Sequence, residues 1–120
     1  MTTSVVGKRV PKLDAADKAL GRATYTHDVR LPGMLHGRIL YSAHPHARIL
    51  HVDTSHAARL PGVRTVLAAA DLPLTRFGYG KDNTPLKGDV VRSLRDEVAA
   101  VAAVDPDVAE EAVSLIRVDY

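Results

Sequence analysis

The segment YSAHPHARILHVD, residues 41–53, holds three histidines: His44, His46 and His51. An imidazole can bind a transition metal or exchange a proton near neutral pH. A zinc site needs three or four ligands whose orientation is held by neighbouring groups. The H-x-H pair around Pro45 lacks that support, because no regular structure fixes its two rings. The pattern therefore favours a solvent-facing connection between two strands, and a metal site using all three histidines is the alternative.

No other combination of residues in the chain matches a recognisable catalytic motif. Ser42, His44 and Asp53 have the residue types of a hydrolase triad, but no G-x-S-x-G turn or oxyanion loop accompanies them. Glu110 and Glu111 are adjacent on a predicted helix, about 100° apart, so their carboxylates do not converge as an acid–base pair. The residues alone therefore predict no catalytic site.

The composition excludes several functional classes. The chain has 120 residues, 46% of them hydrophobic and 25% charged, which is typical of one globular domain. The net charge of +2 and the scarcity of aromatic residues argue against nucleic-acid binding. The absence of cysteine excludes disulfides and thiolate metal sites within this chain. Because no segment resembles a signal peptide or a membrane span, we expect a cytoplasmic protein that does not bind membranes.

Short strands and short helices alternate along the chain. In MLHGRILYS, the alternation places Leu35, Gly37, Ile39 and Tyr41 on one face of a strand. ARILHVD and VRTVLA are predicted as the next two strands, with a short helix through SHAARL between them. The segment TRFGYGKDNTPLKG is a long polar loop without the spacing of a phosphate-binding loop. DVVRSL is predicted as a further strand, and the irregular region 1–33 contains one short helix.

The C-terminal third has the clearest pattern. EVAAVAAV is nearly all apolar, which predicts a central strand buried on both faces. Asp105 is expected to cap the following helix and Pro106 to occupy its first turn. RVDY then begins another strand, so a right-handed strand–helix–strand unit is expected. The predicted class is α/β (α+β), a mixed β-sheet with short helices packed on it.

The order and spacing of several motifs resemble one known domain. LDAADKALGRATYTHDVRLPGMLHGRIL is followed by PHARI, PGV, DLP, EVAAVAA and AEEA. This series resembles the N-terminal α/β hammerhead domain of the molybdopterin-binding large subunit of molybdenum hydroxylases, the family of xanthine dehydrogenase, aldehyde oxidase and hydroxybenzoyl-CoA reductase. The resemblance implies a hammerhead domain over residues 34–120, truncated at its C-terminal strand.

The resemblance also implies a function for the whole enzyme. Family members hydroxylate or reductively dehydroxylate aromatic, heteroaromatic or aldehyde substrates at a molybdopterin-bound molybdenum. The residues that hold the cofactor lie in downstream domains, and iron–sulfur clusters and often FAD lie on partner domains or subunits. We therefore expect a structural and interface module, inactive alone, with no catalytic, cofactor or metal residues of its own.

The resemblance also has implications for two short parts of the chain, the HPHARI connection and the position of Arg95. The HPHARI connection has a regular form in the family, so His44, Pro45, His46 and Arg48 are interface candidates. Arg95 stands where the family usually has glycine, a residue that often serves a positive φ. We therefore expect an altered turn before the central strand.

Overall fold

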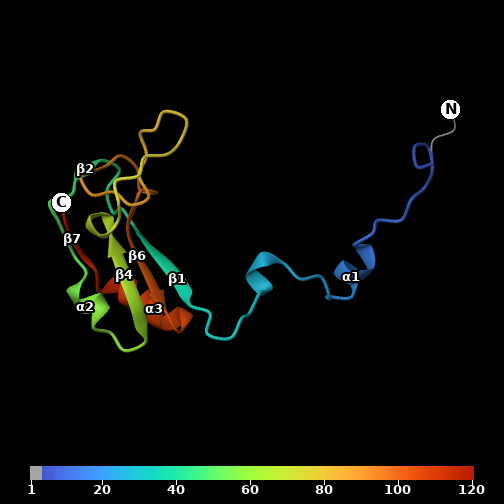
Figure 1. Ribbon diagram of the computed structural model, residues 1–120, viewed down its shortest axis with the longest axis horizontal. Helices are drawn as coiled ribbons and strands as arrows, with labels where there is room; N and C mark the ends of the chain where they lie inside the picture. Colours follow the sequence, from blue (N-terminus) through green and yellow to red (C-terminus); the bar gives the residue numbers. More distant parts are fainter. Residues whose placement is uncertain (1–3) are drawn as a thin grey trace. The chain divides into compact units, whose positions relative to one another are not determined.

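The computed structural model describes residues 4–120 and divides into two units, Met1–Pro32 and Gly33–Tyr120 (Figure 1). The first unit contains the helix α1 (Ala15–Ala19) and the 3-10 helix η1 (Thr26–Asp28), and none of its described residues is buried. Asp14 stands at the N-cap of α1 without a side-chain capping bond, and its carboxylate pairs with Lys18 Nζ at 2.5 Å. Gly21, with a φ of +68°, follows the helix in the left-handed conformation.

The second unit is built on a three-stranded antiparallel sheet. Strand β6 (Glu97–Ala103) lies in its centre, between β1 (His36–Tyr41) and β4 (Val63–Ala68). The three strands lie side by side in Figure 1. The prediction that EVAAVAAV forms a central strand is therefore confirmed.

Two shorter antiparallel ladders complete the second unit. β2 (Ala47–Arg48) pairs with β5 (Val90–Val91), and β3 (His51–Asp53) pairs with β7 (Arg117–Asp119). The single strand expected over ARILHVD is wrong, because its two halves pair with different partners. Between them, the backbone N–H of Ile49 donates to Asp89 and that of Leu50 to Asp119. The strand expected over DVVRSL is likewise reduced to β5.

The predicted α/β hammerhead class with short helices on a sheet is confirmed, but two expectations about strand direction are wrong. Every ladder between the described strands is antiparallel, so the sheet is not mixed in direction. The expected strand–helix–strand crossover within one sheet is also absent from residues 4–120. Both edges of β6 are already occupied, and the chain leaving the last helix pairs with β3 instead.

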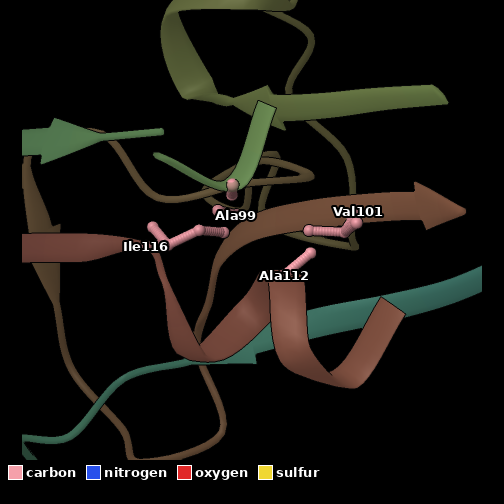
Figure 2. Close-up of a cluster of buried hydrophobic side chains, with 5 residues drawn as sticks. Ala99, Val101, Ala112 and Ile116 are labelled. Atoms are coloured by element: carbon pink, nitrogen blue, oxygen red, sulfur yellow. The ribbon is translucent and has the colours of Figure 1, made fainter. Parts of the chain in front are cut away.

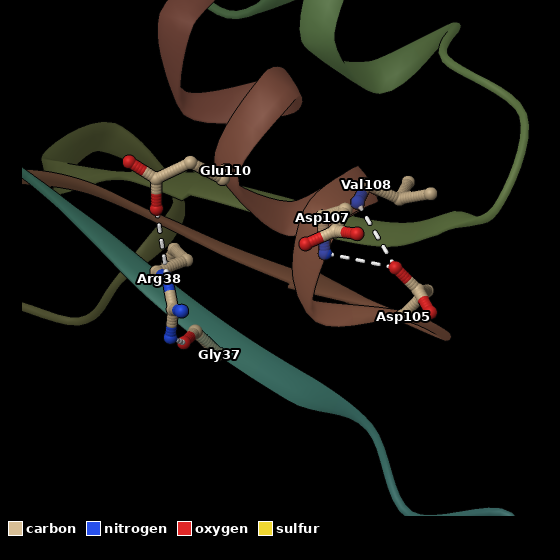
Figure 3. A network of polar contacts seen from close by, with 6 residues as sticks. All are labelled: Gly37, Arg38, Asp105, Asp107, Val108 and Glu110. Carbon is tan, nitrogen blue, oxygen red and sulfur yellow. Dashed lines mark hydrogen bonds and ion pairs between the residues drawn. The ribbon is translucent and has the colours of Figure 1, made fainter.

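Helix α3 (Pro106–Ser114) covers one face of the sheet. Asp105 Oδ1 accepts hydrogen bonds from the backbone N–H groups of Asp107, at 2.8 Å, and Val108, at 3.4 Å, as the sequence predicts (Figure 3). Glu110 on α3 forms an ion pair with Arg38 on β1, in which Glu110 Oε2 accepts a hydrogen bond of 2.9 Å from Arg38 Nε (Figure 3). Since both side chains are exposed, this ion pair contributes at most about 1 kcal/mol.

The main hydrophobic core lies between α3 and the sheet. Ala99 and Val101 of β6 point toward Ala112 of α3, and Ile116 closes one end of the cluster (Figure 2). Helix α2 (Ser55–Ala58) contributes Ala57 to the same cluster. Small side chains at the contact allow close packing of α3 on β6. A second cluster, Ile49, Val91 and Val98, lies under the β2–β5 ladder.

Candidate functional site

The histidine-containing connection is a tight link between β1 and β2. Its bend is held by Ser42, which is buried and whose Oγ donates to the His44 carbonyl at 2.7 Å. The same Oγ accepts a bond of 3.0 Å from the His44 backbone N–H. A single hydroxyl therefore fixes the path of the chain into Pro45, while the side chains of Pro45 and His46 remain exposed.

The three imidazoles of this segment do not converge. The His44 ring makes an edge-to-face contact with Tyr120, with ring centroids 4.7 Å apart. His51 stands on β3, where it is paired with Asp119. Within residues 4–120, no three side chains of His, Asp or Glu come together as a group that could hold a metal ion. The alternative metal site of His44, His46 and His51 therefore has no geometric support.

Replacing both His44 and His46 with alanine is expected to leave zinc content unchanged. The free energy of unfolding should fall by less than about 1 kcal/mol, because the double substitution removes one ring contact, between His44 and Tyr120. Metal analysis and chemical denaturation of the purified chain measure both effects, and His46→Ala alone is the control that keeps this ring pair. A melting temperature that rises with zinc in the parent but not in the double variant would contradict this expectation.

The triad-like combination in this region is not a triad. The Ser42 hydroxyl bonds to the backbone of His44 and not to its imidazole. Asp53 Oδ1 accepts a hydrogen bond of 2.8 Å from the Ser55 backbone N–H at the start of α2. This bond, with the Ser55 side chain and the nearby His56 and His51 as smaller causes, holds the pKa of Asp53 below its usual range. Asp53 thus orients the entry into α2 and does not orient a base.

The long polar loop contains a feature that the sequence did not reveal. Lys87 is 7% exposed, and its Nζ donates to the Thr84 carbonyl at 2.9 Å and to Asn83 Oδ1. Beside it lies a cavity of about 370 Å³ whose rim carries Arg76 and Arg92. The ammonium group is engaged in holding the loop closed, so it is not presented as a nucleophile or base. The loop's polar composition predicts exposure, and the burial of Lys87 follows only from the loop's conformation.

Arg95, the position at which the resemblance predicts glycine, lies in the turn before β6. The Arg95 backbone N–H donates to Ser93 Oγ at 3.1 Å, and the Asp96 N–H donates to the Ser93 carbonyl at 3.1 Å. Arg95 does not have a positive φ, which among the described non-glycine residues occurs only at Lys81. The turn therefore uses a conformation that does not require glycine.

The antiparallel sheet, its covering helices and the connecting segments define an α/β domain of hammerhead architecture. The family described as aldehyde oxidase and xanthine dehydrogenase, a/b hammerhead domain, matches residues 20–120. The chain belongs to this family. Its homologues are molybdenum hydroxylases, as the motif series of the sequence predicts.

The individual relatives are much longer than this chain, which matches one part of each. The chain is 43% identical to a probable xanthine dehydrogenase subunit of Bacillus subtilis, covering 89% of this chain and 15% of that protein. It is 39% identical to the nicotinate dehydrogenase large molybdopterin subunit of Eubacterium barkeri, covering 97% and 28%. The solved CO dehydrogenase from Oligotropha carboxidovorans matches with a TM-score of 0.88 and 39% identity, covering 95% and 15%. The chain therefore spans a small part of the proteins it resembles.

None of the helices between residues 4 and 120 has the length and apolar character that a membrane crossing requires.

Proposed function

We propose that this chain is a structural and interface module of a molybdenum hydroxylase large subunit. The observation that carries the proposal is the fit of nearly the whole chain to 15% of the CO dehydrogenase chain, at a TM-score of 0.88. A domain that is so small a part of an enzyme subunit is expected to support a centre built largely by the rest of that subunit. The folded module proposed is residues 34–120, preceded by the irregular segment 1–33.

The proposal extends to the chemistry and partners of the whole enzyme. The name of the Eubacterium barkeri relative includes molybdopterin, which supports a molybdopterin-bound molybdenum as the centre that the module serves. The reaction would be hydroxylation or reductive dehydroxylation of an aromatic, heteroaromatic or aldehyde substrate. Electrons would leave through iron–sulfur clusters, and FAD where present, on partner domains or subunits. His44, Pro45, His46 and Arg48 stay predicted interface residues, and a cytoplasmic location stays a prediction.

The isolated 120-residue chain is expected to bind no molybdenum and to have no oxidoreductase activity. A chimeric subunit, in which this chain replaces the matched segment of the Bacillus subtilis relative, is expected to assemble with its partner subunits and to contain molybdenum. Elemental analysis after gel filtration is the measurement for both proteins. Stoichiometric molybdenum on the isolated chain, or a chimeric subunit that folds without molybdenum while the parent subunit contains it, would overturn the proposal. Coding sequence that resembles pterin-binding domains, either after the Tyr120 codon or in a neighbouring gene, would be a further check of the proposal.

A further inference from the structure

We propose that the face of the three-stranded sheet turned away from α3 binds an apolar surface of the same large-subunit polypeptide outside this domain. This inference rests on the proposed function, since it requires the chain to operate as part of such a subunit. The surface, called here the open face, consists of two rows across the sheet: Ile39, Ala100 and Leu67, and next to them Gly37, Ala102 and Thr65.

The contacts of neighbouring residues identify which way the open face points. Arg38 of β1 bonds to Glu110 on α3, and Leu40 packs against the main core. Successive side chains of a strand point to opposite faces of a sheet. Gly37 and Ile39 therefore point away from α3. The same alternation applies on β6, where Ala99 and Val101 contact the core and the alanines between and beyond them point away.

The open face is mostly apolar, and the second unit itself, Gly33–Tyr120, does not cover it. Its Ile39 is 41% exposed, and Leu35 and Tyr41, on either side of it, are 43% and 51% exposed. None of the six residues of the open face carries a charge. The middle strand β6 contributes two alanines, β1 contributes glycine and isoleucine, and β4 contributes threonine and leucine. These mostly small side chains leave a shallow surface on which another element can pack closely. A contiguous apolar surface of this kind is characteristic of an interaction site.

The sequence of β6 independently indicates that a second layer covers the sheet. A strand that is apolar on both faces is typical of a sheet packed on both sides. In this chain, α3 and α2 both belong to the core on one side of β6. On the other side, Val98 at one end lies under the β2–β5 ladder, whereas Ala100 and Ala102 are only partly buried. The covering layer for these two residues must therefore come from outside the second unit, Gly33–Tyr120.

The relatives indicate where that layer comes from. In CO dehydrogenase and in the Bacillus subtilis relative, the region matching this chain is joined covalently to about six times as much polypeptide. A tethered surface is present at an effective concentration in the millimolar range, far above that of a separate protein or a second copy. An uncharged, shallow face without ion-pairing groups is also suited to permanent contact within one polypeptide. The remainder of the large subunit is therefore the occupant to which we assign the open face.

Single cysteines can test this assignment, because the chain has no cysteine of its own. Ile39→Cys places a thiol on the open face, and Leu74→Cys, at a site that is 80% exposed immediately before the long loop, is the matched control. Each variant is made in the isolated chain and in the chimeric subunit, and its reaction with N-ethylmaleimide is followed by peptide mass spectrometry. In the isolated chain both thiols should react at similar rates. In the chimeric subunit the thiol of Ile39→Cys should react at least about tenfold more slowly than that of Leu74→Cys.

A thiol-linked benzophenone on Ile39→Cys then identifies the occupant. Crosslinks to peptides of the same polypeptide outside the matched segment support the assignment. Crosslinks to residues 4–32 of this chain, to a partner subunit or to a second copy overturn it, as does equal labelling of both positions in a chimeric subunit that contains molybdenum. Those results leave the proposed function standing, whereas a chimeric subunit that folds without molybdenum or fails to fold contradicts the proposed function and this inference together.

Discussion

Val101→Asp is expected to abolish folding of the chain. Val101 lies in the middle of β6, is 3% exposed and packs in the cluster that joins the sheet to α3 (Figure 2). The other buried members of that cluster are alanines and Ile116, which offer no hydrogen-bond partner to a carboxylate. A buried charge without a partner must either be neutralised by protonation or be exposed to water by opening of the core. Each of these costs more free energy than the unfolding of so small a core. Circular dichroism and chemical denaturation of the purified variant test this.

Two further substitutions separate the loss of packing from the burial of charge. Val101→Ala should reduce the free energy of unfolding by about 1–3 kcal/mol, through lost apolar burial and the cavity left behind. Glu111→Ala, on the exposed side of α3, should stay within about 0.5 kcal/mol of the parent. If Val101→Asp unfolds at the same denaturant concentration as Glu111→Ala, β6 is not the centre of the fold.

The elements that the sequence predicts correctly are those with local causes. The run of valine and alanine in β6 has no polar residue to place in water, so its central position follows from composition alone. Asp105 and Pro106 form a local start signal for α3, and the capping bonds of Asp105 span only two and three residues. The resemblance to a hammerhead domain could be seen in the sequence because it consists of many such local motifs that follow one another in a fixed order.

The features that the sequence did not predict depend on partners distant in the chain. Nothing within ARILHVD separates β2 from β3, because the break is set by Asp89 and Asp119, which lie far along the chain. The apolar alternation in β1 correctly groups Gly37 and Ile39 on one face, but it cannot tell whether the chain itself covers that face. The histidines are equally ambiguous in sequence, since the ring of His44 is placed by Tyr120.

Gly62→Val is expected to lower the free energy of unfolding by about 3 kcal/mol or more. Gly62 ends the turn before β4 with a φ of +94°, a conformation that is costly for other residues by about 1–2 kcal/mol. A Cβ added there would lie 3.2 Å from Val108 Cγ1 and 3.3 Å from Val104 Cγ2, so the turn would be pushed away from α3. The hydrogen bond from the Val104 N–H to the Gly62 carbonyl, 3.0 Å long, would be strained by the same movement. Overpacking of this kind adds about 1–3 kcal/mol.

A comparison of alanine variants isolates the steric part of this effect. Gly78 also has a positive φ, of +87°, but an added Cβ there meets only Asp82 Oδ1 at 3.9 Å, an ordinary contact. Gly62→Ala should therefore be more destabilising than Gly78→Ala in chemical denaturation. Combining Gly62→Ala with Val108→Ala removes the crowding atoms of Val108 and leaves that of Val104. The double variant should therefore be more stable than the sum of the two single effects predicts, by about 0.5 kcal/mol or more. Strict additivity would mean that the contact with Val108 on α3 does not contribute to the requirement for glycine at this turn.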